Sequence, residues 1–492
     1  MNYRLIFQLL ALVSGALGSA FLFCAGIAFL LRHNPGEEKA LTGFLIATGV
    51  ALALTILLSL LGRGAKAKIF RKEALTLVGL SWILASILGL IPYLWTLPGA
   101  PLANALFESV SGLTTTGASV LDELETLPAS LLFWRQLSQW IGGMGVIVFF
   151  VAILGHLGAS GKILFSNESS ANRADFEQGR MQSVVYRLFA VYMLISAGCF
   201  LALYAVGLSA WDALLHMFST VATGGFSTRS GSVADLANAA AEWVMIVFMI
   251  VGSVSFFFLL ALVRRPRRAW QSFSEVRVYL LLLFLSTLAV IFSLSLSPLH
   301  FASVEEMVRA AAFQVVSLAS TAGFSTQDYD TWPVFTHALL LLLMLIGGCT
   351  ASTAGGLKVA RFIVGSKIVA HSLERSYRSH VVRPVIVNGR PIDNQFRDDV
   401  LIYIVILVFI LIGSILVVGL FESAMGIEGV VSAVVATLFN IGPGFGEVGP
   451  TKNFDHLTGA TKVYLSILMI TGRIELFALL VIFTPALWRK FE

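Results

Sequence analysis

Long runs of apolar residues alternate with short polar connections along almost the whole chain. Runs of about 20 residues or more, the length that a membrane's hydrocarbon core of about 30 Å requires, occur at ten places in the sequence. We therefore predict an all-α polytopic membrane protein with ten spanning segments, of which only the eighth is interrupted. The segments are 5–31, 41–62, 74–95, 129–155, 181–206, 239–263, 276–297, 334–372, 397–421 and 457–488.

Between the members of each later pair of segments lies a shorter apolar stretch that runs into a turn built on one glycine. These turns read T-T-T-G-A-S at 114–119, T-G-G-F-S-T at 223–228, T-A-G-F-S-T at 321–326 and N-I-G-P-G-F at 440–445. A recurrence of roughly every 100 to 120 residues indicates four copies of one module. The candidate central glycines are Gly117, Gly225, Gly323 and Gly442.

The short stretches hold about 10 to 18 apolar residues, which as helices reach only about halfway through a membrane. Irregular backbone at that depth is tolerated only where protein buries it or water bathes it. Four such turns therefore require a common aqueous axis, where glycine allows carbonyl groups to face an ion. A half-helix whose C-terminus points inward favours a cation there. The alternative is that the turns are ordinary loops whose glycines allow helices to pack closely.

The module divides the chain into five parts. The first two segments have no half-helix between them, and we predict that they form an extra N-terminal hairpin over residues 1–68. The other eight segments pair into four pore repeats. These repeats are predicted at 69–160, 161–268, 269–383 and 384–492.

Composition and charge agree with a membrane protein. The chain has 492 residues, of which 57% are hydrophobic and only 12% charged, against about 25% charged residues in soluble domains. If the N-terminus is inside, most of the 33 Lys and Arg fall on the inner side and most of the 28 Asp and Glu on the outer side. The first segment lacks an A-x-A-like cleavage site, so we expect it to be retained.

The basic residues of the inner side form runs, which we interpret as topogenic anchors and contacts for anionic membrane lipids, with no nucleic acid implied. Histidines and three cysteines are scattered without ligand spacing, and no Ser/His/Asp set suggests catalysis. A membrane-embedded enzyme, the remote alternative, would need such residues to converge. We expect no catalytic residues and no bound cofactor. The basic runs lie at 63–72, in R-R-P-R-R at 264–268 and at 358–397.

Two features point to control of the pore. The string G-G-C-T-A-S-T-A-G-G-L-K at 347–358 contains Gly347, Gly348, Gly355 and Gly356, and each glycine costs a helix roughly 1 kcal/mol. We expect a break at mid-membrane, which is either a flexible kink or a moving element. Arg473 lies near the middle of the last segment, where a charge must face water or a partner. Its partner is either a carboxylate or carbonyl of a neighbouring helix, or the water of the pore.

Five segments carry a resemblance to a known family. They are F-E-S-V-S-G-L-T-T-T-G-A-S at 107–119, Q-W-I-G-G-M-G at 139–145, F-Q-V-V-S-L-A-S-T-A-G-F-S-T at 313–326, the string at 347–358, and N-I-G-P-G-F-G at 440–446. With these residues, the chain resembles the Trk/Ktr/HKT superfamily of potassium transporters, and specifically its bacterial TrkH/TrkG branch. The extra N-terminal hairpin also fits TrkH better than the eight-helix KtrB type.

The resemblance implies a pseudo-fourfold selectivity filter that prefers potassium over sodium, with K⁺ as the transported ion. It also implies that 347–358 is an intramembrane loop that gates the pore, with Arg473 as an electrostatic barrier below the filter. Transport is either passive or ion-coupled, and a sodium-permeable or sodium-coupled relative is the alternative. Pro443 departs from the other turns and predicts an asymmetric filter. The implied filter residues are Thr115, Thr116, Gly117, Thr223, Gly224, Gly225, Thr321, Ala322, Gly323, Asn440, Ile441 and Gly442.

The resemblance extends to partners and location. The chain has no βαβ pattern or dinucleotide fingerprint of its own, and the family implies a separate TrkA-type cytoplasmic nucleotide-binding regulatory subunit. We expect it to contact the basic loop at 358–397. The family also implies a homodimer in the bacterial inner membrane, and the charge pattern predicts cytoplasmic N- and C-termini.

Overall fold

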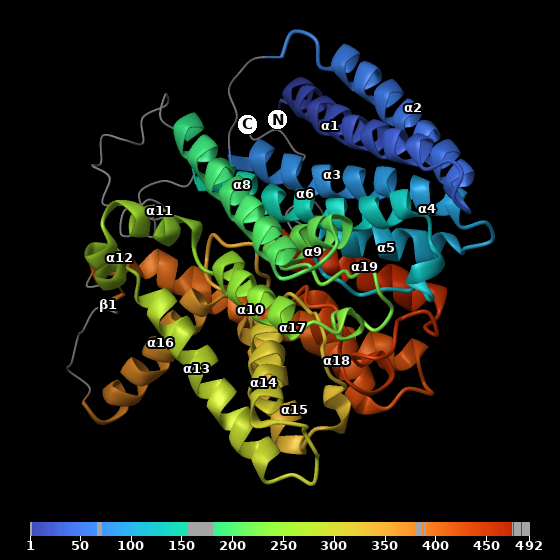
Figure 1. Ribbon diagram of the computed structural model, residues 1–492. Helices are drawn as coiled ribbons and strands as arrows, with labels where there is room; N and C mark the ends of the chain where they lie inside the picture. The colour runs from blue at the N-terminus through green and yellow to red at the C-terminus, as the bar shows by residue number, and fades with distance from the viewer. Residues whose placement is uncertain are drawn as a thin grey trace.

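The computed structural model describes residues 2–65, 71–154, 181–378, 386–387, 390–474, 476 and 484. Helices make up most of it, and several short ones end near the middle of the molecule (Figure 1). The all-α prediction is confirmed. The exception is a small antiparallel pair in the basic loop, formed by β1 (Ile386–Val387) and β2 (Arg390–Pro391).

Six helical stretches of the described residues are long and apolar enough to span a membrane. The N-terminal hairpin predicted from sequence is present at the edge of the molecule, where its two helices lie side by side (Figure 1). The fourth predicted segment, α6 (Ala129–Leu154), is a 26-residue helix. The six stretches are α1 (Tyr3–Leu30), α2 (Glu37–Leu61), α3 with α4 (Arg71–Gly89 and Ile91–Thr96), α8 (Met181–Ala205), α13 (Ser274–Ser295) and α17 (Asn394–Phe421).

The four short apolar stretches are helices, as predicted. Three contain 12 residues and one contains 16, so at 1.5 Å per residue they extend about 18 to 24 Å. Almost every side chain in their C-terminal halves is buried. Each is followed within a few residues by its glycine turn. These pore helices are α5 (Leu102–Leu113), α9 (Ala210–Val221), α14 (Val304–Ala319) and α18 (Ile427–Leu438).

The prediction of an uninterrupted span at 239–263 is wrong. The structure has two helices, α10 (Ala239–Ser253) and α11 (Phe256–Arg264), which meet at an angle of 97°. The break is stable because a distant segment satisfies the backbone that it frees. The carbonyl of Ser253 accepts a 2.9 Å hydrogen bond from the Cys349 N–H, and the carbonyl of Gly252 accepts one of 3.1 Å from the Thr353 N–H.

The interruption predicted in the eighth segment is present, between α15 (Val334–Ile346) and α16 (Val359–Tyr377). The last helix, α19 (Gly459–Arg473), ends sooner than predicted. Arg473 is therefore the final residue of a helix and does not lie at its middle. Most of the predicted segment beyond it, including Glu475, lies outside the described residues.

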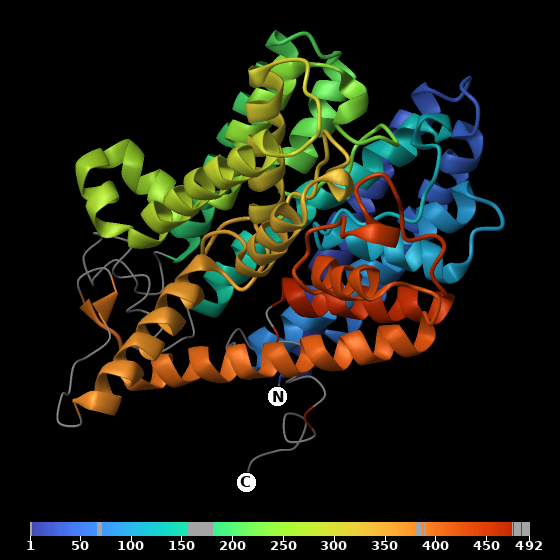
Figure 2. The ribbon, with the colours of Figure 1, turned by 90° about the horizontal axis from the view of Figure 1, so that it is seen from below.

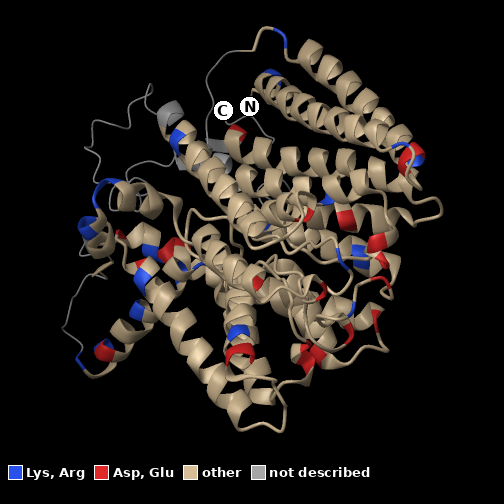
Figure 3. Cartoon of the chain, viewed as in Figure 1, with Lys and Arg blue, Asp and Glu red and all other residues tan. Residues whose placement is uncertain are grey.

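Charge is unevenly distributed over the molecule. Lys and Arg gather around α11, α12 (Pro266–Ser272) and α16, while Asp and Glu gather mainly on loops near α18 and at the far end of the α1–α2 hairpin (Figure 3). α17 runs along one edge of the helical body, and α16 meets it near the basic end (Figure 2). The pore helices occur once in each predicted repeat, although the repeat boundaries themselves stay a prediction.

Candidate functional site: a ring of four glycine turns

The four turns share an unusual backbone conformation. In each, the central glycine and the residue two positions before it have positive φ. The central glycines have φ values of 84°, 83°, 75° and 106°, in chain order. The preceding residues Thr115, Thr223, Thr321 and Asn440 have values of 50° to 57°, which non-glycine residues rarely adopt. Four repetitions of the same strained pattern show that the repeats share one local structure.

The same hydrogen bond ties each turn to its own pore helix. The residue before the central glycine donates its N–H to the carbonyl five positions earlier, at 2.8 to 2.9 Å. This bond folds the chain back on the C-terminal end of the pore helix. The donor and acceptor pairs are Thr116 and Ser111, Gly224 and Ser219, Ala322 and Ser317, and Ile441 and Ala436.

The four turns form a closed ring. A Cβ atom added to Gly117 would lie 2.2 Å from the carbonyl oxygen of Gly224, in the second turn. The same atom added to Gly225 would lie 2.1 Å from the Ala322 oxygen, and on Gly323 it would lie 1.8 Å from the Ile441 oxygen. On Gly442 it would lie 2.7 Å from the Thr116 oxygen, which returns to the first turn. Only glycine fits at the four central positions, because each one packs against the next repeat's carbonyl.

One cavity of about 190 Å³ opens onto this ring, and all four central glycines line it. Charged side chains of both signs line it, among them Asp122, Glu123, Arg229 and Lys452. The loops that follow the turns form this vestibule, on the side away from the ends of the pore helices.

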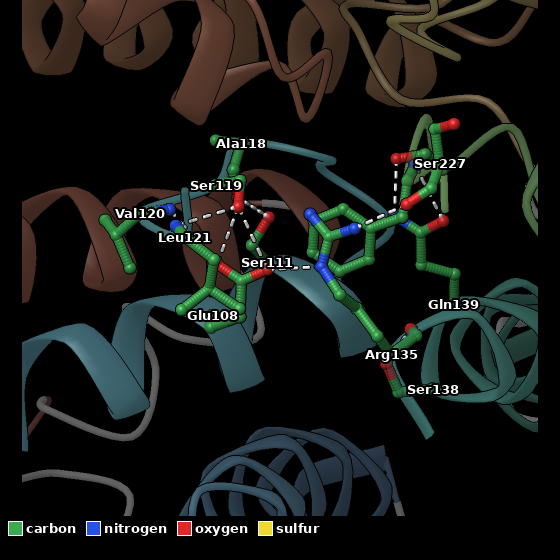
Figure 4. Close-up of polar contacts among 12 residues, drawn as sticks. Glu108, Ser111, Ala118, Ser119, Val120, Leu121, Arg135, Ser138, Gln139 and Ser227 are labelled. Atoms are coloured by element: carbon green, nitrogen blue, oxygen red, sulfur yellow. Dashed lines mark hydrogen bonds and ion pairs between the residues drawn. The ribbon is translucent and has the colours of Figure 1, made fainter. Parts of the chain in front are cut away.

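A buried ion pair holds the first two turns together at the vestibule (Figure 4). Arg135 Nε lies 2.6 Å from Glu108 Oε1, and both side chains are buried. Glu108 also accepts a 3.1 Å bond from the Val120 N–H. Arg135 donates from Nη1 to the Ser227 carbonyl at 2.8 Å and lies 3.6 Å from the centre of the Phe226 ring. Glu108 is therefore held by local bonds to Arg135 and to the backbone that follows the first turn.

Glu447, beyond the fourth turn, has a similar role. Its Oε1 accepts a 3.0 Å hydrogen bond from the Gly426 N–H, at the start of the fourth pore helix. That bond holds the pKa of Glu447 below its ordinary value, because it stabilises the carboxylate. The negative charge is therefore fixed at the N-terminus of α18, where the helix dipole favours it.

The glycine-rich segment 347–358 forms a loop whose two ends touch. The Lys358 N–H donates to the Ile346 carbonyl at 2.9 Å, and the Leu357 N–H donates to the Leu345 carbonyl at 3.1 Å. Gly347 and Gly356 have φ values of 72° and 84°. A Cβ atom added to Gly356 would lie 2.5 Å from the Gly347 Cα, so only glycines allow the ends to approach this closely.

The loop lies directly against the ring, on the side opposite the vestibule. The Gly355 N–H donates a 2.6 Å hydrogen bond to Thr321 Oγ1, in the third turn. A Cβ atom on Gly355 would lie 2.3 Å from the Phe439 carbonyl, at the end of the fourth pore helix, and one on Gly348 would lie 2.5 Å from the Ala354 Cβ. Thr353 Oγ1 donates to the Val221 carbonyl at 3.1 Å, at the end of the second. The loop therefore contacts three of the four repeats where their pore helices end.

Arg473 joins the loop to the first repeat. The side chain is buried, and its Nη1 donates a 2.8 Å hydrogen bond to the Thr353 carbonyl. Nη2 donates a 3.3 Å bond to the Gly142 carbonyl of α6, while Nε has no partner among the described residues. The partners seen are thus carbonyl groups, which was one of the alternatives for this residue.

Sequence reasoning missed several residues that the structure brings to the site. Gln139 lies in a quoted motif but was assigned no role, and it contacts the second turn directly. The hydroxyl of Thr353 connects the loop to the backbone carbonyls of Val221 and Gly252. Glu275, on α13, accepts bonds from the N–H groups of Thr350 and Ala360, at 2.6 and 3.1 Å. The sequence did carry a signal for Gln139, which is a polar residue inside an apolar segment. Thr353 and Glu275 carried no such signal, because their roles depend on how the loop 347–358 folds.

A membrane domain with four pore helices around a glycine ring is the architecture of an ion transport protein. A family model described as "TrkH: Cation transport protein" matches residues 44–490. The chain belongs to this family, which confirms the resemblance.

Named relatives match along most of their length. The chain is 34% identical over 497 residues to the Trk system potassium uptake protein TrkH of Escherichia coli K12, covering 100% of both chains. It is 35% identical to that of Halomonas elongata, covering 91% of this chain and 92% of the relative. The crystal structure of the potassium transporter TrkH from Vibrio parahaemolyticus superposes with a TM-score of 0.89 at 31% identity, covering 99% and 100% of the two chains.

These findings define the chain as a multi-pass membrane transporter, because its family and its relatives are transport proteins. For the same reason it is not an enzyme. The predicted all-α membrane fold and the predicted class of protein, a transporter, are therefore both confirmed.

Proposed function

We propose that the protein takes up potassium across the bacterial inner membrane through the ring of glycine turns. The observation that carries this proposal is the closed cycle of contacts from Gly117 to Gly442, since each central glycine packs against the next repeat's carbonyl. The names of the relatives support potassium as the ion. K⁺ is then cargo, and the protein needs no cofactor to move it.

The chemistry of the ring suits a dehydrated cation. Carbonyl oxygens can replace the water of hydration of K⁺, and the four pore helices direct the negative ends of their dipoles at the same place. The residues proposed to bind K⁺ are those of the three positions ending at each central glycine. They are Thr115, Thr116, Gly117, Thr223, Gly224, Gly225, Thr321, Ala322, Gly323, Asn440, Ile441 and Gly442.

The loop 347–358 is the proposed gate. The residues proposed to form it are Gly347, Gly348, Gly355, Gly356 and Arg473. Buried residues fill the loop, and it lies against the ends of the pore helices. Opening requires the bonds from Gly355 to Thr321 and from Arg473 to Thr353 to break or shift. The positive charge of Arg473 would repel cations below the ring while the loop is closed.

The basic end of the molecule, around α11, α12 and α16 (Figure 3), is the proposed cytoplasmic side. Cytoplasmic N- and C-termini are part of the proposal, on the strength of the charge pattern along the sequence. A TrkA-type nucleotide-binding subunit would contact it and move the loop through α16. Anionic lipids would bind the same basic end of the molecule. A homodimer is the proposed assembly, on the strength of the family alone.

The experiment is complementation of bacteria that lack potassium uptake, grown at low potassium. The native chain should restore growth, and rubidium uptake should rise with it. Gly225→Asp is the inactive control, because a Cβ there would lie 2.1 Å from the Ala322 oxygen. No growth by cells with the native chain in the membrane, together with its regulatory subunit, would refute the proposal.

A sodium-permeable or sodium-coupled transporter is the second candidate, and the fourth turn favours it. Gly442 makes the loosest contact of the ring, at 2.7 Å against 1.8 to 2.2 Å for the others, and its φ of 106° is the largest. Pro443 follows it and has no N–H to donate. Reversal potentials in opposed potassium and sodium gradients separate the two candidates.

A further inference from the structure

One filter turn is held from behind by a side chain. Gln139, on α6 of the first repeat, donates from Nε2 to the carbonyl of Gly224 at 2.5 Å. Its Oε1 accepts a 3.2 Å hydrogen bond from the Phe226 N–H. A single amide thus binds the backbone on both sides of the central Gly225. Arg135 and His216 contact Ser227, which lies farther along the turn.

The bound carbonyl is a member of the ring. The oxygen of Gly224 is the atom against which Gly117 packs. The equivalent oxygens belong to Thr116, Ala322 and Ile441, and among the described residues no side chain donates to them. One carbonyl of the four is therefore positioned by a side chain of the neighbouring repeat, while three are positioned by their own backbone.

The sequence of the second turn makes room for this contact. Position 224 is glycine, where the other turns have Thr116, Ala322 and Ile441. A Cβ atom added to Gly224 would lie 2.5 Å from both Cδ and Oε1 of Gln139. Any larger residue at 224 would displace the amide, so Gly224 and Gln139 form a matched pair.

The helix that carries Gln139 is fixed above and below it. Arg135, one turn earlier on the same face, is bound to Glu108 and to the Ser227 carbonyl (Figure 4). Gly142, about one turn later, packs so closely that an added Cβ would lie 1.9 Å from the Leu113 carbonyl. Gln139 is fully buried between these two anchors. Its amide is therefore held rigidly against the backbone on both sides of Gly225.

We propose that Gln139 is a positioning residue for ion selectivity, which holds the Gly224 carbonyl at the radius that suits potassium and prevents the ring from contracting around sodium. This proposal rests on potassium transport as the proposed function. Sodium is the smaller ion, so it gains most when a carbonyl is free to move inward. A side-chain hydrogen bond to the carbonyl opposes that movement, because the amide would lose a buried bond.

The test compares two variants that break the contact from opposite sides. Gln139→Leu removes both hydrogen bonds at similar side-chain size, and Gly224→Ala displaces the amide while leaving it in the protein. The matched control is Gln136→Leu, because Gln136 is a buried glutamine of the same helix whose amide has no partner among the described residues.

Two readouts are needed. The first is the ratio of sodium to potassium concentrations that halve rubidium uptake by cells. The second is the rise in melting temperature of the purified full-length protein in potassium against sodium chloride, which needs no open gate. A lost hydrogen bond corresponds to a change of roughly two- to tenfold. We expect both variants to lower the potassium preference by that amount, and the double variant to lower it no further, since the two changes remove one contact.

A merely structural role would lower abundance or maximal uptake and leave the ratio unchanged. If both variants keep the wild-type ratio at normal abundance, or if Gln136→Leu shifts it equally, the inference is wrong. Should Gln139→Leu fail to reach the membrane, Gly224→Ala decides the outcome. Failure of the proposed function looks different, because the wild-type chain itself would then show no potassium preference in either readout.

Discussion

The guanidinium of Arg473 donates a 2.8 Å hydrogen bond to the carbonyl oxygen of Thr353. This contact joins the last helix to the middle of the glycine-rich loop, across 120 residues of sequence. The Thr353 hydroxyl lies within hydrogen-bonding distance of the Val221 and Gly252 carbonyls, at 3.1 and 2.9 Å, and can donate its single proton to either. One threonine thus connects the proposed barrier, the end of a pore helix and the break between α10 and α11.

Arg473→Ala should raise cation flux. The substitution removes a buried positive charge from beneath the ring and one of the bonds that hold the loop closed. Rubidium uptake should increase several-fold in cells that express the variant, and most clearly without the regulatory subunit. Arg473→Lys, which keeps the charge but not the planar two-bond geometry, should give an intermediate rate. Unchanged or lower uptake by Arg473→Ala, at normal membrane abundance, would contradict the barrier.

Glu275→Ala should also open the loop, from its other side. Glu275 accepts hydrogen bonds from the N–H groups of Thr350 and Ala360, which lie on either side of the loop's centre, and it interacts electrostatically with Lys358. Removing the carboxylate leaves the two N–H groups without this acceptor and destabilises the closed position. Basal rubidium uptake should rise. Because both variants act on one loop, Glu275→Ala with Arg473→Ala should give less than the product of the separate increases.

Glu38→Gln is the control for that experiment, since Glu38 is exposed at the start of α2, in the hairpin at the edge of the molecule (Figure 1). Its uptake should match the wild type. If Glu275→Ala leaves basal uptake unchanged while the protein is abundant and folded, then the carboxylate supports the fold and does not restrain the loop.

The sequence revealed those parts of the site whose conformation is determined by residues close together in the chain. A central glycine is required at Gly117 because the backbone there has positive φ and touches the next turn, and that requirement recurs four times as a visible pattern. The break after Ser253 was not predictable, because its free carbonyls are satisfied by a loop about 100 residues away. Gln139 was missed for the same reason, since its partner Gly224 belongs to another repeat. Arg473 was found as an intramembrane charge, but its place at a helix end depends on packing.

The buried pair of Glu108 and Arg135 should be essential for stability. Both side chains are buried, so removal of one charge leaves the other uncompensated at a cost of about 3 to 5 kcal/mol. Glu108→Gln should lower the melting temperature of the detergent-solubilised protein strongly. Glu108→Gln with Arg135→Met should recover part of that loss, because no unpaired charge remains. Equal melting temperatures for wild type and Glu108→Gln would show that the pair contributes little.

Gly323→Ala should abolish uptake while the protein remains in the membrane. The added methyl would lie 1.8 Å from the Ile441 carbonyl oxygen, the tightest contact of the ring, at a backbone φ of 75° that alanine rarely adopts. Neither the backbone nor the oxygen can move away without opening the ring. The matched control is Gly413→Ala on α17, where nothing lies within 4 Å of the added atom, and alanine there should favour the helix slightly. Rubidium uptake and melting temperature should both be near wild type for the control. Normal uptake by Gly323→Ala would mean that ions do not pass through the ring, and it would refute the pore itself.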